Sequence, residues 1–353
     1  MPLGRGDFAV DAAPAWRYCA RNPALPLRRS AMPERTLRPW PYTPAPHLVA
    51  DTGGTNTRVA LADSGVLRQG SIRRYANAGH GSLSEILSAF LRDTATTECA
   101  GVCVAVAGPV RDGHVRMTNL DWDIDTEDLA RVGRTRHVAL LNDLQAQGHA
   151  LSALDPRHVV TLSPGDSAPE GAVQLVVGAG TGFNAAAVLH DGARVLVTAS
   201  ECGHMHLPQQ TEDEQAFARV LVHRHGVATV EEALSGRGLV ALHHWTSGHD
   251  IAPDALIAAI AAGDAQARET GRLYARFLAR TLASLGLVHL PYGGIYLIGG
   301  VARAMAPHLL SLGFLEAYRE MGRYSALVEA LPIRVIQDDY AALLGCATYL
   351  AAP

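Results

Sequence analysis

Two segments of the chain share one order: an apolar strand, a turn rich in glycine and threonine, and a second apolar strand. They read LVADTGGTNTRVALAD at 48–63 and AVQLVVGAGTGFNAAAVL at 172–189. In the first we predict strands at 48–50 and 59–61, joined by a tight hairpin at 51–56. Strand and helix patterns alternate after each segment. This order predicts an α/β fold of two similarly built domains with a cleft between them.

The two turns have the composition of a polyphosphate site. Glycines let an anion approach the backbone N–H groups closely, and Asp51 stands where a hydrated Mg²⁺ would bridge to the phosphates. The second turn is not a dinucleotide fingerprint, because Gly178, Gly180 and Gly182 lack the third fingerprint glycine and a strand follows. We therefore predict a nucleotide site at the turns, with an ordinary hairpin as the alternative for the first.

Residue usage excludes several chemistries. All 30 basic residues are arginine and lysine is absent, whereas a P-loop, a pyridoxal Schiff base and a protein kinase each require a lysine. The five cysteines are odd in number and have no Cys-x-x-Cys spacing. They indicate a reducing compartment and thiols that pack as small apolar residues, rather than a zinc site.

The charge and hydropathy of the chain limit its partners. Its net charge is −4, and no long basic run occurs in the part expected to fold, which argues against nucleic acid. No stretch reaches the ~18 apolar residues of a membrane span. We expect a soluble, cytoplasmic protein that does not bind membranes.

Residues 1–45 differ from the rest of the chain. They hold seven arginines against three acidic residues, are rich in proline and show no sustained helix or strand period. We predict a disordered or artefactual leader. The alternatives are a transit peptide and a translation start at Met32.

The remaining patterns predict further strands and helices. The apolar runs at 101–110 and 137–143 are typical of buried parallel strands. The period of 82–93, with Ser82 and Glu85 as a capping box, predicts a helix. We expect the other helices at about 144–154, 212–224, 229–236, 265–286, 302 onward and 340–351, and strands at 293–300 and 332–338.

Asn142 and Asp143 follow a predicted buried strand. The carboxyl end of such a strand is the usual ligand edge of an α/β sheet. An aspartate there would accept the proton of an attacking hydroxyl, as a kinase requires. Capping of the helix that follows is the alternative role of Asp143.

Two further motifs suit a sugar and an adenosine. Glu201 and His204, in SECGHMHLP, would share the neighbouring hydroxyls of one sugar; metal binding by His204 and His206 is the alternative. Gly299 and Gly300, where a strand meets a helix, would let adenosine lie against the backbone.

The order of these motifs resembles the bacterial glucokinase family, within the superfamily of actin, sugar kinases and heat-shock ATPases. The motifs are Asp-x-Gly-Gly-Thr-Asn, Asn-Asp after a strand, Gly-x-Gly-Thr-Gly, Glu-x-Gly-His and Gly-Gly-x-x-x-x-Gly-Gly, and the resemblance runs from about 47 to 350. MTNLDWDID at 117–125 and EEALSGRGL at 231–239 also fit. The resemblance implies two ribonuclease-H-like (actin-like ATPase) domains flanking a cleft: a small domain at 46–152, completed by 338–353, and a large domain at 153–337.

The resemblance also implies an ATP-dependent, magnesium-dependent glucokinase of glycolysis, a homodimer in the cytoplasm, with Asp143 as general base. The implied sugar ligands are Asn142, Asp143, Glu201, His204 and Glu231. The implied nucleotide residues are Asp51, Gly53, Gly54, Thr55, Asn56, Gly178, Gly180, Thr181, Gly182, Gly299 and Gly300, with Asp51 toward Mg²⁺. A kinase for another hexose, a non-catalytic sugar- or nucleotide-binding regulator, and polyphosphate or ADP as donor are the alternatives.

The chain departs from the family pattern at two positions. Cys202 stands where a small residue such as glycine or alanine is common, which bears on the shape of the sugar pocket. Asn184 stands where glycine is frequent, which bears on the phosphate turn. Glu231 has a competing interpretation, because Thr229 and Glu232 beside it also read as a capping box. No cysteine-rich zinc motif follows His204, and residues 1–45 show no helix-turn-helix pattern.

Overall fold

The computed structural model describes residues 45–117, 120–192 and 194–352, which belong to one compact unit. The predicted leader, apart from Ala45, lies outside the described residues, as does the alternative start at Met32. Two residues of the MTNLDWDID motif, Thr118 and Asn119, also lie outside them.

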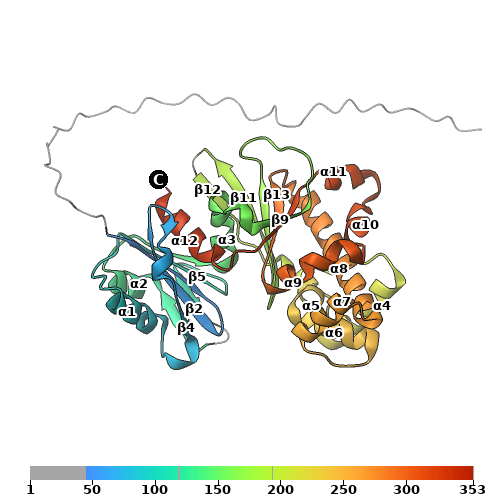
Figure 1. Cartoon of the computed structure of the whole chain (residues 1–353), viewed down its shortest axis with the longest axis horizontal. Helices are drawn as coiled ribbons and strands as arrows, with labels where there is room; N and C mark the ends of the chain where they lie inside the picture. The colour runs from blue at the N-terminus through green and yellow to red at the C-terminus, as the bar shows by residue number, and fades with distance from the viewer. Residues whose placement is uncertain (1–44, 118–119, 193, 353) are drawn as a thin grey trace, which may run out of the picture. The chain divides into compact units, whose positions relative to one another are not determined.

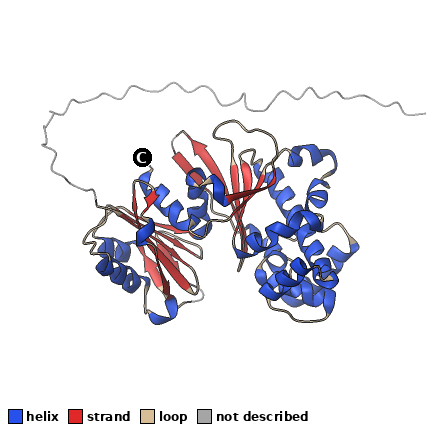
Figure 2. Cartoon of the chain, viewed as in Figure 1, coloured by secondary structure: helices blue, strands red, loops and turns tan. Residues whose placement is uncertain are grey.

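The described residues form two six-stranded sheets and a short two-stranded one (Figures 1 and 2). In the first sheet the order is β3-β2-β1-β5-β8, with β4 also pairing with β2; β1, β5 and β8 run parallel and β2 runs antiparallel to β1. Its strands are β1 (His47–Thr52), β2 (Asn56–Asp63), β3 (Val66–Leu67), β4 (Arg73–Ala76), β5 (Gly101–Val106) and β8 (Val138–Asn142). The strand predicted for 101–110 thus ends at Val106, shortly before Pro109, which has no N–H to donate to a sheet.

The second sheet repeats this topology. Its order is β12-β11-β10-β13-β14-β9, where β10, β13 and β14 run parallel and β11 runs antiparallel to β10. Its strands are β9 (Val159–Ser163), β10 (Gln174–Ala179), β11 (Phe183–Asp191), β12 (Arg194–Val197), β13 (Gly294–Ile298) and β14 (Ile333–Ile336). Each sheet therefore contains a glycine hairpin with two parallel strands added on one side of it, as predicted for two similarly built halves; the second sheet differs in that β9, which precedes its hairpin, pairs antiparallel with β14 at the edge.

The helices confirm the predicted α/β alternation and add to it. They are α1 (Leu83–Asp93), α2 (Thr126–Gly133), α3 (Asp143–Ala150), α4 (Glu212–His225), α5 (Val230–Leu234), α6 (Gly236–Ser247), α7 (Pro253–Ala262), α8 (Ala265–His289), α9 (Gly300–Leu309), α10 (Phe314–Arg319), α11 (Ser325–Glu329) and α12 (Ala341–Ala351). The sequence did not predict α6, whose first turn contains two glycines, or α7, whose alanine-rich sequence shows little amphipathic period. The two-stranded sheet consists of β6 (His114–Arg116) and β7 (Asp123–Asp125).

The first sheet is covered on both faces. Alternate residues of β1 point to opposite sides: Leu48 packs in one core with Phe90 of α1, and Val49 packs in another with Cys346 of α12. The C-terminal helix α12, red in Figure 1, therefore packs against the N-terminal strands β1 and β5. The boundaries at 152/153 and 337/338 remain a prediction, because the described residues form one compact unit.

Helix α3 contacts both sheets. Ala146 belongs to the core of β1, β5 and α12, whereas Leu144 and Leu151, just past the end of the helix, belong to the core of the second sheet. A Cβ on Gly345 of α12 would overlap the carbonyl oxygen of Ala146, so glycine is required where the two helices approach. The helix that begins at Asp143 is thus held from two sides.

The predicted capping box of α1 is formed in part. The Oγ of Ser82 accepts the N–H of Glu85 at 3.2 Å. The Glu85 carboxylate accepts the N–H of Gly81 at 2.8 Å instead of that of Ser82. The helix still begins where predicted, because the Ser82 bond satisfies one of its free N–H groups.

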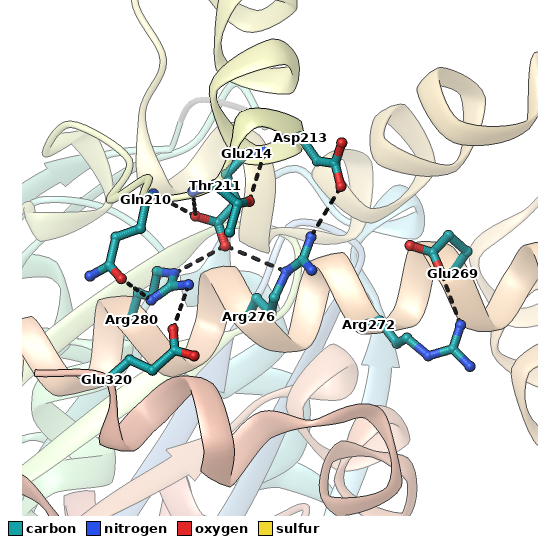
Figure 3. A network of polar contacts seen from close by, with 9 residues as sticks. All are labelled: Gln210, Thr211, Asp213, Glu214, Glu269, Arg272, Arg276, Arg280 and Glu320. Atoms are coloured by element: carbon teal, nitrogen blue, oxygen red, sulfur yellow. Dashed lines mark hydrogen bonds and ion pairs between the residues drawn. The ribbon is translucent and has the colours of Figure 1, made fainter. Parts of the chain in front are cut away.

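A buried ion-pair network fastens α4 to α8 (Figure 3). Glu214 is fully buried, and its carboxylate accepts Arg280 Nε at 3.0 Å and the N–H groups of Gln210 and Thr211 at 2.6 and 3.1 Å. Arg280 also pairs with Glu320 at 2.9 Å. Arg276 Nε lies 3.5 Å from the Glu214 carboxylate as well, so each buried charge of the network has more than one partner of opposite charge. The network fixes the start of α4, which follows the predicted sugar-binding motif in the chain.

Two expectations from composition can be compared with the described residues. Cys99, Cys103, Cys202 and Cys346 are buried free thiols, as expected for cysteines that pack as small apolar residues. In the part of the chain that the structure describes, no helix combines the length and the apolar character needed to cross a membrane.

Candidate active site

The carboxyl ends of β1, β5 and β8 meet at one edge of the first sheet. In the parallel register Thr52 stands beside Val106, and Val106 stands beside Asn142. Asp51 precedes this row in β1, and Asp143 follows it after β8. The topology thus brings two predicted site residues to the same sheet edge.

Burial raises the pKa of both carboxyl groups. For Asp143 burial is the largest cause, the charge of Asp51 adds to it, the N–H of Leu144 opposes it, and the pKa rises to about 6. Burial also raises the pKa of Asp51, although Arg58, whose Nη1 lies 3.1 Å from Asp51 Oδ2, acts in the opposite direction. Two buried carboxylates that repel one another favour a cation or a proton between them.

Asn142 caps α3, and Asp143 is the first residue of the helix. Asn142 Oδ1 accepts the N–H of Leu144 at 3.0 Å, and the N–H of Asn142 donates to Gln145 Oε1 at 3.2 Å, which makes a capping box. Asn142 Nδ2 donates to the carbonyl oxygen of Gly108 at 3.0 Å. The N-cap position thus belongs to Asn142, although Asp143 Oδ1 also accepts the N–H of Leu144 at 2.8 Å and so contributes to capping the helix. Its carboxylate lies in the first turn, where the helix dipole favours negative charge.

The first glycine turn is shorter than predicted. Asp51 and Thr52 belong to β1, and Asn56 belongs to β2, so the turn itself is 53–55. It is closed by a hydrogen bond from the N–H of Gly53 to the carbonyl oxygen of Asn56 at 3.0 Å.

Asn77, which the sequence analysis missed, holds this turn. It is 1% exposed, its Nδ2 donates to the carbonyl oxygen of Gly53 at 2.8 Å, and its Oδ1 accepts Thr57 Oγ1 at 2.8 Å. The N–H of Asn77 donates to the carbonyl oxygen of Thr55 at 2.9 Å. In the sequence nothing distinguishes Asn77 from a surface asparagine, because its partners lie about twenty residues earlier.

The second glycine turn lies against the paired glycines predicted for adenosine. A Cβ on Gly180 would be 3.7 Å from the backbone nitrogen of Gly300, and one on Gly299, whose φ is +105°, would overlap the carbonyl oxygen of Ala179. The carbonyl oxygen of Gly180 accepts the N–H of Gly236, the first residue of α6, at 2.8 Å. The predicted phosphate and adenosine elements are thus adjacent.

The strand that leads into the second turn also contacts the helix that carries Asp143. Gly178, predicted as part of the turn, lies in β10, and a Cβ on it would be 3.3 Å from Leu144 Cδ1, so Leu144 packs on this glycine. Leu144 directly follows Asp143, so the helix of the predicted base packs against the strand that ends at the predicted phosphate turn.

We call residues 200–204 the sugar loop. The side chains of Glu201 and His204 are exposed, and the N–H of His204 donates to the carbonyl oxygen of Glu201 at 3.1 Å. A Cβ on Gly203 would overlap the carbonyl oxygen of Phe183 at the end of the second turn. This contact explains the glycine of the Glu-x-Gly-His motif, because a larger residue would push the loop away from the turn.

Glu231 joins the second turn to an arginine. Its Oε2 accepts the N–H of Phe183 at 2.9 Å, and its Oε1 lies 2.5 Å from Arg237 Nη2. The competing capping box is wrong: in the described structure Thr229 makes no side-chain cap bond to α5, and Glu232 pairs with Arg237 at 3.0 Å. Arg237 was not singled out by the sequence.

The two departures from the family pattern lie side by side. Asn184 pairs with Gly178 in the β10–β11 register, and its Oδ1 accepts the N–H of Cys202 at 3.1 Å and the hydroxyl of Ser200 at 3.4 Å. Asn184 Nδ2 donates to the carbonyl oxygen of Ser200 at 2.5 Å. Cys202 is buried, which raises the pKa of its thiol.

The structure thus brings the predicted residues into contact along two chains of neighbours. One runs from Asp143 through Leu144 to Gly178, and the charge of Asp51 acts on Asp143 at its start. The other runs from Glu231 through Phe183 to the sugar loop. Within the described residues, no group of three or more His, Cys, Asp and Glu side chains could hold a metal ion, so metal binding at His204 and His206 gains no support.

Comparisons with known proteins agree with this arrangement. The model of the glucokinase family matches residues 48–353. A glucokinase of Xanthomonas campestris pv. campestris is 32% identical over 317 residues, which cover 86% of this chain and 94% of the relative. A glucokinase of Rhizobium leguminosarum bv. trifolii is 29% identical over 91% of this chain and 95% of its own.

Solved structures resemble the chain as well. The crystal structure of a glucokinase from an Antarctic psychrotroph superposes with a TM-score of 0.78 at 26% identity, over 87% of this chain and 98% of that one. A glucokinase of Balamuthia mandrillaris in complex with glucose has a TM-score of 0.72 at 18% identity, over 88% of this chain and 94% of that one, and shares the fold.

Proposed function

The chain belongs to the glucokinase family, and we propose that it transfers the γ-phosphoryl group of ATP to the 6-hydroxyl of glucose, with Asp143 as the general base. The observation that carries the proposal is the contact of the Asp143 helix with β10, the strand that leads into the second glycine turn, through Leu144 and Gly178. A base and a phosphate-binding backbone that lie together can act on one hydroxyl and one phosphoryl group.

The environment of Asp143 suits this role. With a pKa of about 6, the carboxylate is mostly ionised at pH 7, yet it is more basic than an exposed aspartate. The hydroxyl proton passes to the carboxylate while the oxygen attacks the phosphorus in line. The protein contributes mainly positioning and charge neutralisation to this step.

Backbone groups of the two turns would hold the phosphates. Gly53, Gly54, Thr55 and Asn56 would contact them from the first sheet. Gly178, Gly180, Thr181 and Gly182 would contact them from the second. Because the chain has no lysine, backbone N–H groups, threonine hydroxyls, arginine and a metal ion would balance the phosphate charge. Adenosine would lie against Gly299 and Gly300.

The residues at the sheet edge fit Mg²⁺. This ion keeps several waters and binds through one or two carboxylates together with substrate phosphates, and Asp51 and Asp143 are two buried carboxylates whose pKa values are both raised. Asp51 would hold the ion beside the first turn. When bound, the ion supplies charge neutralisation for the transferred phosphoryl group.

We propose Asn142, Asp143, Glu201, His204 and Glu231 as the sugar ligands. Two contacts support a shared site: Glu231 accepts the N–H of Phe183, and Gly203, which lies between Glu201 and His204, packs on the carbonyl oxygen of the same residue. Another hexose is the second candidate substrate, because discrimination depends on contacts to each hydroxyl. We further propose a cytoplasmic homodimer of glycolysis, with a small domain at 46–152 plus 338–353 and a large domain at 153–337.

A coupled assay with ATP and Mg²⁺ tests the proposal. Purified protein would be measured against glucose, mannose, fructose, galactose and N-acetylglucosamine, with ADP and polyphosphate as alternative donors. We expect glucose and ATP to give the highest kcat/KM. If no sugar is phosphorylated but glucose still raises the melting temperature, the chain is a sugar-binding regulator and the proposal is wrong.

A further inference from the structure

We propose that Asn184 is a positioning residue that holds the sugar loop on the second glycine turn and thereby sets the affinity for glucose. The inference rests on the function proposed above. It concerns a residue at which this chain departs from the pattern of its family, and whose side chain reaches the sugar loop.

One side chain holds both neighbours of Glu201. Asn184 Nδ2 donates to the carbonyl oxygen of Ser200, directly before Glu201, and Asn184 Oδ1 accepts the N–H of Cys202, directly after it. The hydroxyl of Ser200 donates to the same oxygen at 3.4 Å. The backbone that presents the Glu201 carboxylate is therefore held on both sides by one amide group, and the Ser200 hydroxyl, which also accepts the N–H of Cys202 at 3.1 Å, adds to it.

The exposure of Glu201 shows why such support matters. Glu201 is exposed, so packing does little to fix its position, and the bonds of its two neighbours hold the backbone that carries it. Without the Asn184 amide, the loop would sample other conformations and Glu201 would meet a sugar hydroxyl less often.

The backbone of Asn184 has a separate role. It pairs with Gly178 across the β10–β11 hairpin through main-chain groups, which any substituent leaves in place. Loss of the side chain therefore affects the sugar loop but leaves the ladder next to the phosphate turn intact. Loss of the Asn184 side chain should therefore weaken the binding of glucose without weakening the binding of ATP.

Kinetics of Asn184→Ala in the full-length protein test the proposal. We expect the KM for glucose to rise about tenfold, and the KM for ATP and kcat to stay within about twofold of the wild type. The equilibrium affinity for glucose, measured without ATP from the sugar-induced rise in melting temperature, should fall to the same extent. Gln174→Ala is the matched control: it removes side-chain bonds to Tyr296 and His190 at the other end of the same hairpin, and should leave both KM values unchanged.

A double-mutant cycle tests whether the loop is the target. Ser200→Ala removes the hydroxyl that donates to Asn184 Oδ1 and that also accepts the N–H of Cys202 at 3.1 Å, but it keeps the carbonyl that accepts from Asn184. We expect Ser200→Ala to raise the KM for glucose about threefold in the wild type and by a larger factor in Asn184→Ala, since the Ser200 hydroxyl is then the remaining side-chain acceptor for the N–H of Cys202.

Other outcomes overturn the proposal. A KM for glucose that stays within about twofold in Asn184→Ala contradicts a positioning role. Equal rises in both KM values, or a similar change in the Gln174 control, indicate a general loss of structure instead. If the proposed function itself is wrong, the wild-type protein will phosphorylate no sugar. This result distinguishes failure of the proposed function from failure of the role proposed for Asn184.

Discussion

The two glycine turns have the same strand context but are held in different ways. The first, at 53–55, is held mainly by one buried side chain of its own sheet, Asn77, which follows β4. The second is held by groups of the proposed site itself: Glu231 bonds Phe183, and Gly203 packs on the same residue. The second turn therefore shares its supports with the sugar, whereas the first does not.

This difference separates the expected effects of substitutions. A change that loosens the first turn should affect ATP and leave glucose binding nearly intact. A change that moves the second turn itself should raise the KM for both substrates. A change that moves only the sugar loop should raise the KM for glucose alone. Four experiments, in decreasing order of expected effect, test this distinction.

The largest effect is expected for Asp143→Asn, because Asp143 serves both turns. Loss of the base should lower kcat by about 10²–10⁴ with small changes in either KM. The folded pKa of about 6 exceeds the ordinary value of 3.8, so ionisation destabilises the fold as the pH rises from 4 through 6, and the penalty is complete above 6. The neutral amide removes this penalty, and the melting temperature at pH 8 should rise by about 2–4 °C. Wild-type turnover in the variant would refute the assignment of Asp143 as the base.

Next in size is Gly203→Ala, which acts at the second turn. The new Cβ would overlap the carbonyl oxygen of Phe183, so the sugar loop must move away. We expect kcat/KM for glucose to fall about 100-fold, since a displacement of about 1 Å in a catalytic constellation can cost that much. Gly70→Ala is the control, because a Cβ there meets nothing within 4 Å. Equal activity of the two variants would show that the loop does not depend on this close approach.

Asn77→Ala tests the first turn. Loss of the bonds to Gly53 and Thr57 should raise the KM for ATP about tenfold, with the KM for glucose within about twofold. Ser71→Ala is the matched control. It also removes a partly buried side-chain bond to β2, in which the N–H of Leu61 donates to Ser71 Oγ at 2.9 Å, but this bond lies away from the turn. A rise in the KM for glucose as large as that for ATP would remove the distinction between the two turns.

The smallest effect is expected from pH. Because Asp143 must be ionised to act as a base and has a pKa of about 6, kcat/KM should fall about tenfold between pH 7 and pH 5. The residual activity of Asp143→Asn should lack this decrease. A wild-type profile that is flat over the same range would mean that another group accepts the proton.

Much of the fold could be predicted from the sequence because its signals are local. Apolar runs, helix periods and glycine turns identified β1, β5, β8, β10, β13 and β14, as well as α1, α8 and α12. Helix α6 was missed because its first turn contains two glycines, and it forms where the Gly236 N–H meets the carbonyl oxygen of Gly180. Local propensity cannot indicate such a contact with a distant turn.

The residues of the proposed site also fall into two groups, those that a local sequence pattern indicates and those that only the tertiary structure reveals. The motifs themselves predicted Asp51, Asp143 and Glu201, since each lies in a short pattern with a chemical meaning. The sequence did not indicate Asn77, because its partners Gly53 and Thr57 lie about twenty residues earlier in the chain. It did not indicate Arg237, because two neighbouring carboxylates, Glu231 and Glu232, compete for this side chain. Asn184 was noticed as a departure, but only its contacts with Ser200 and Cys202 showed what its amide group holds.

The sequence by itself determined which residues make strands, turns and glycine-lined surfaces, because these depend on neighbours a few positions apart. It also determined that the proposed phosphate site contains no lysine. The tertiary structure alone decided that Asp51 acts on the pKa of Asp143, that Asn77 supports the first turn and that Glu231 supports the second. These relations depend on burial and on distances between segments far apart in the chain, and no local pattern specifies them.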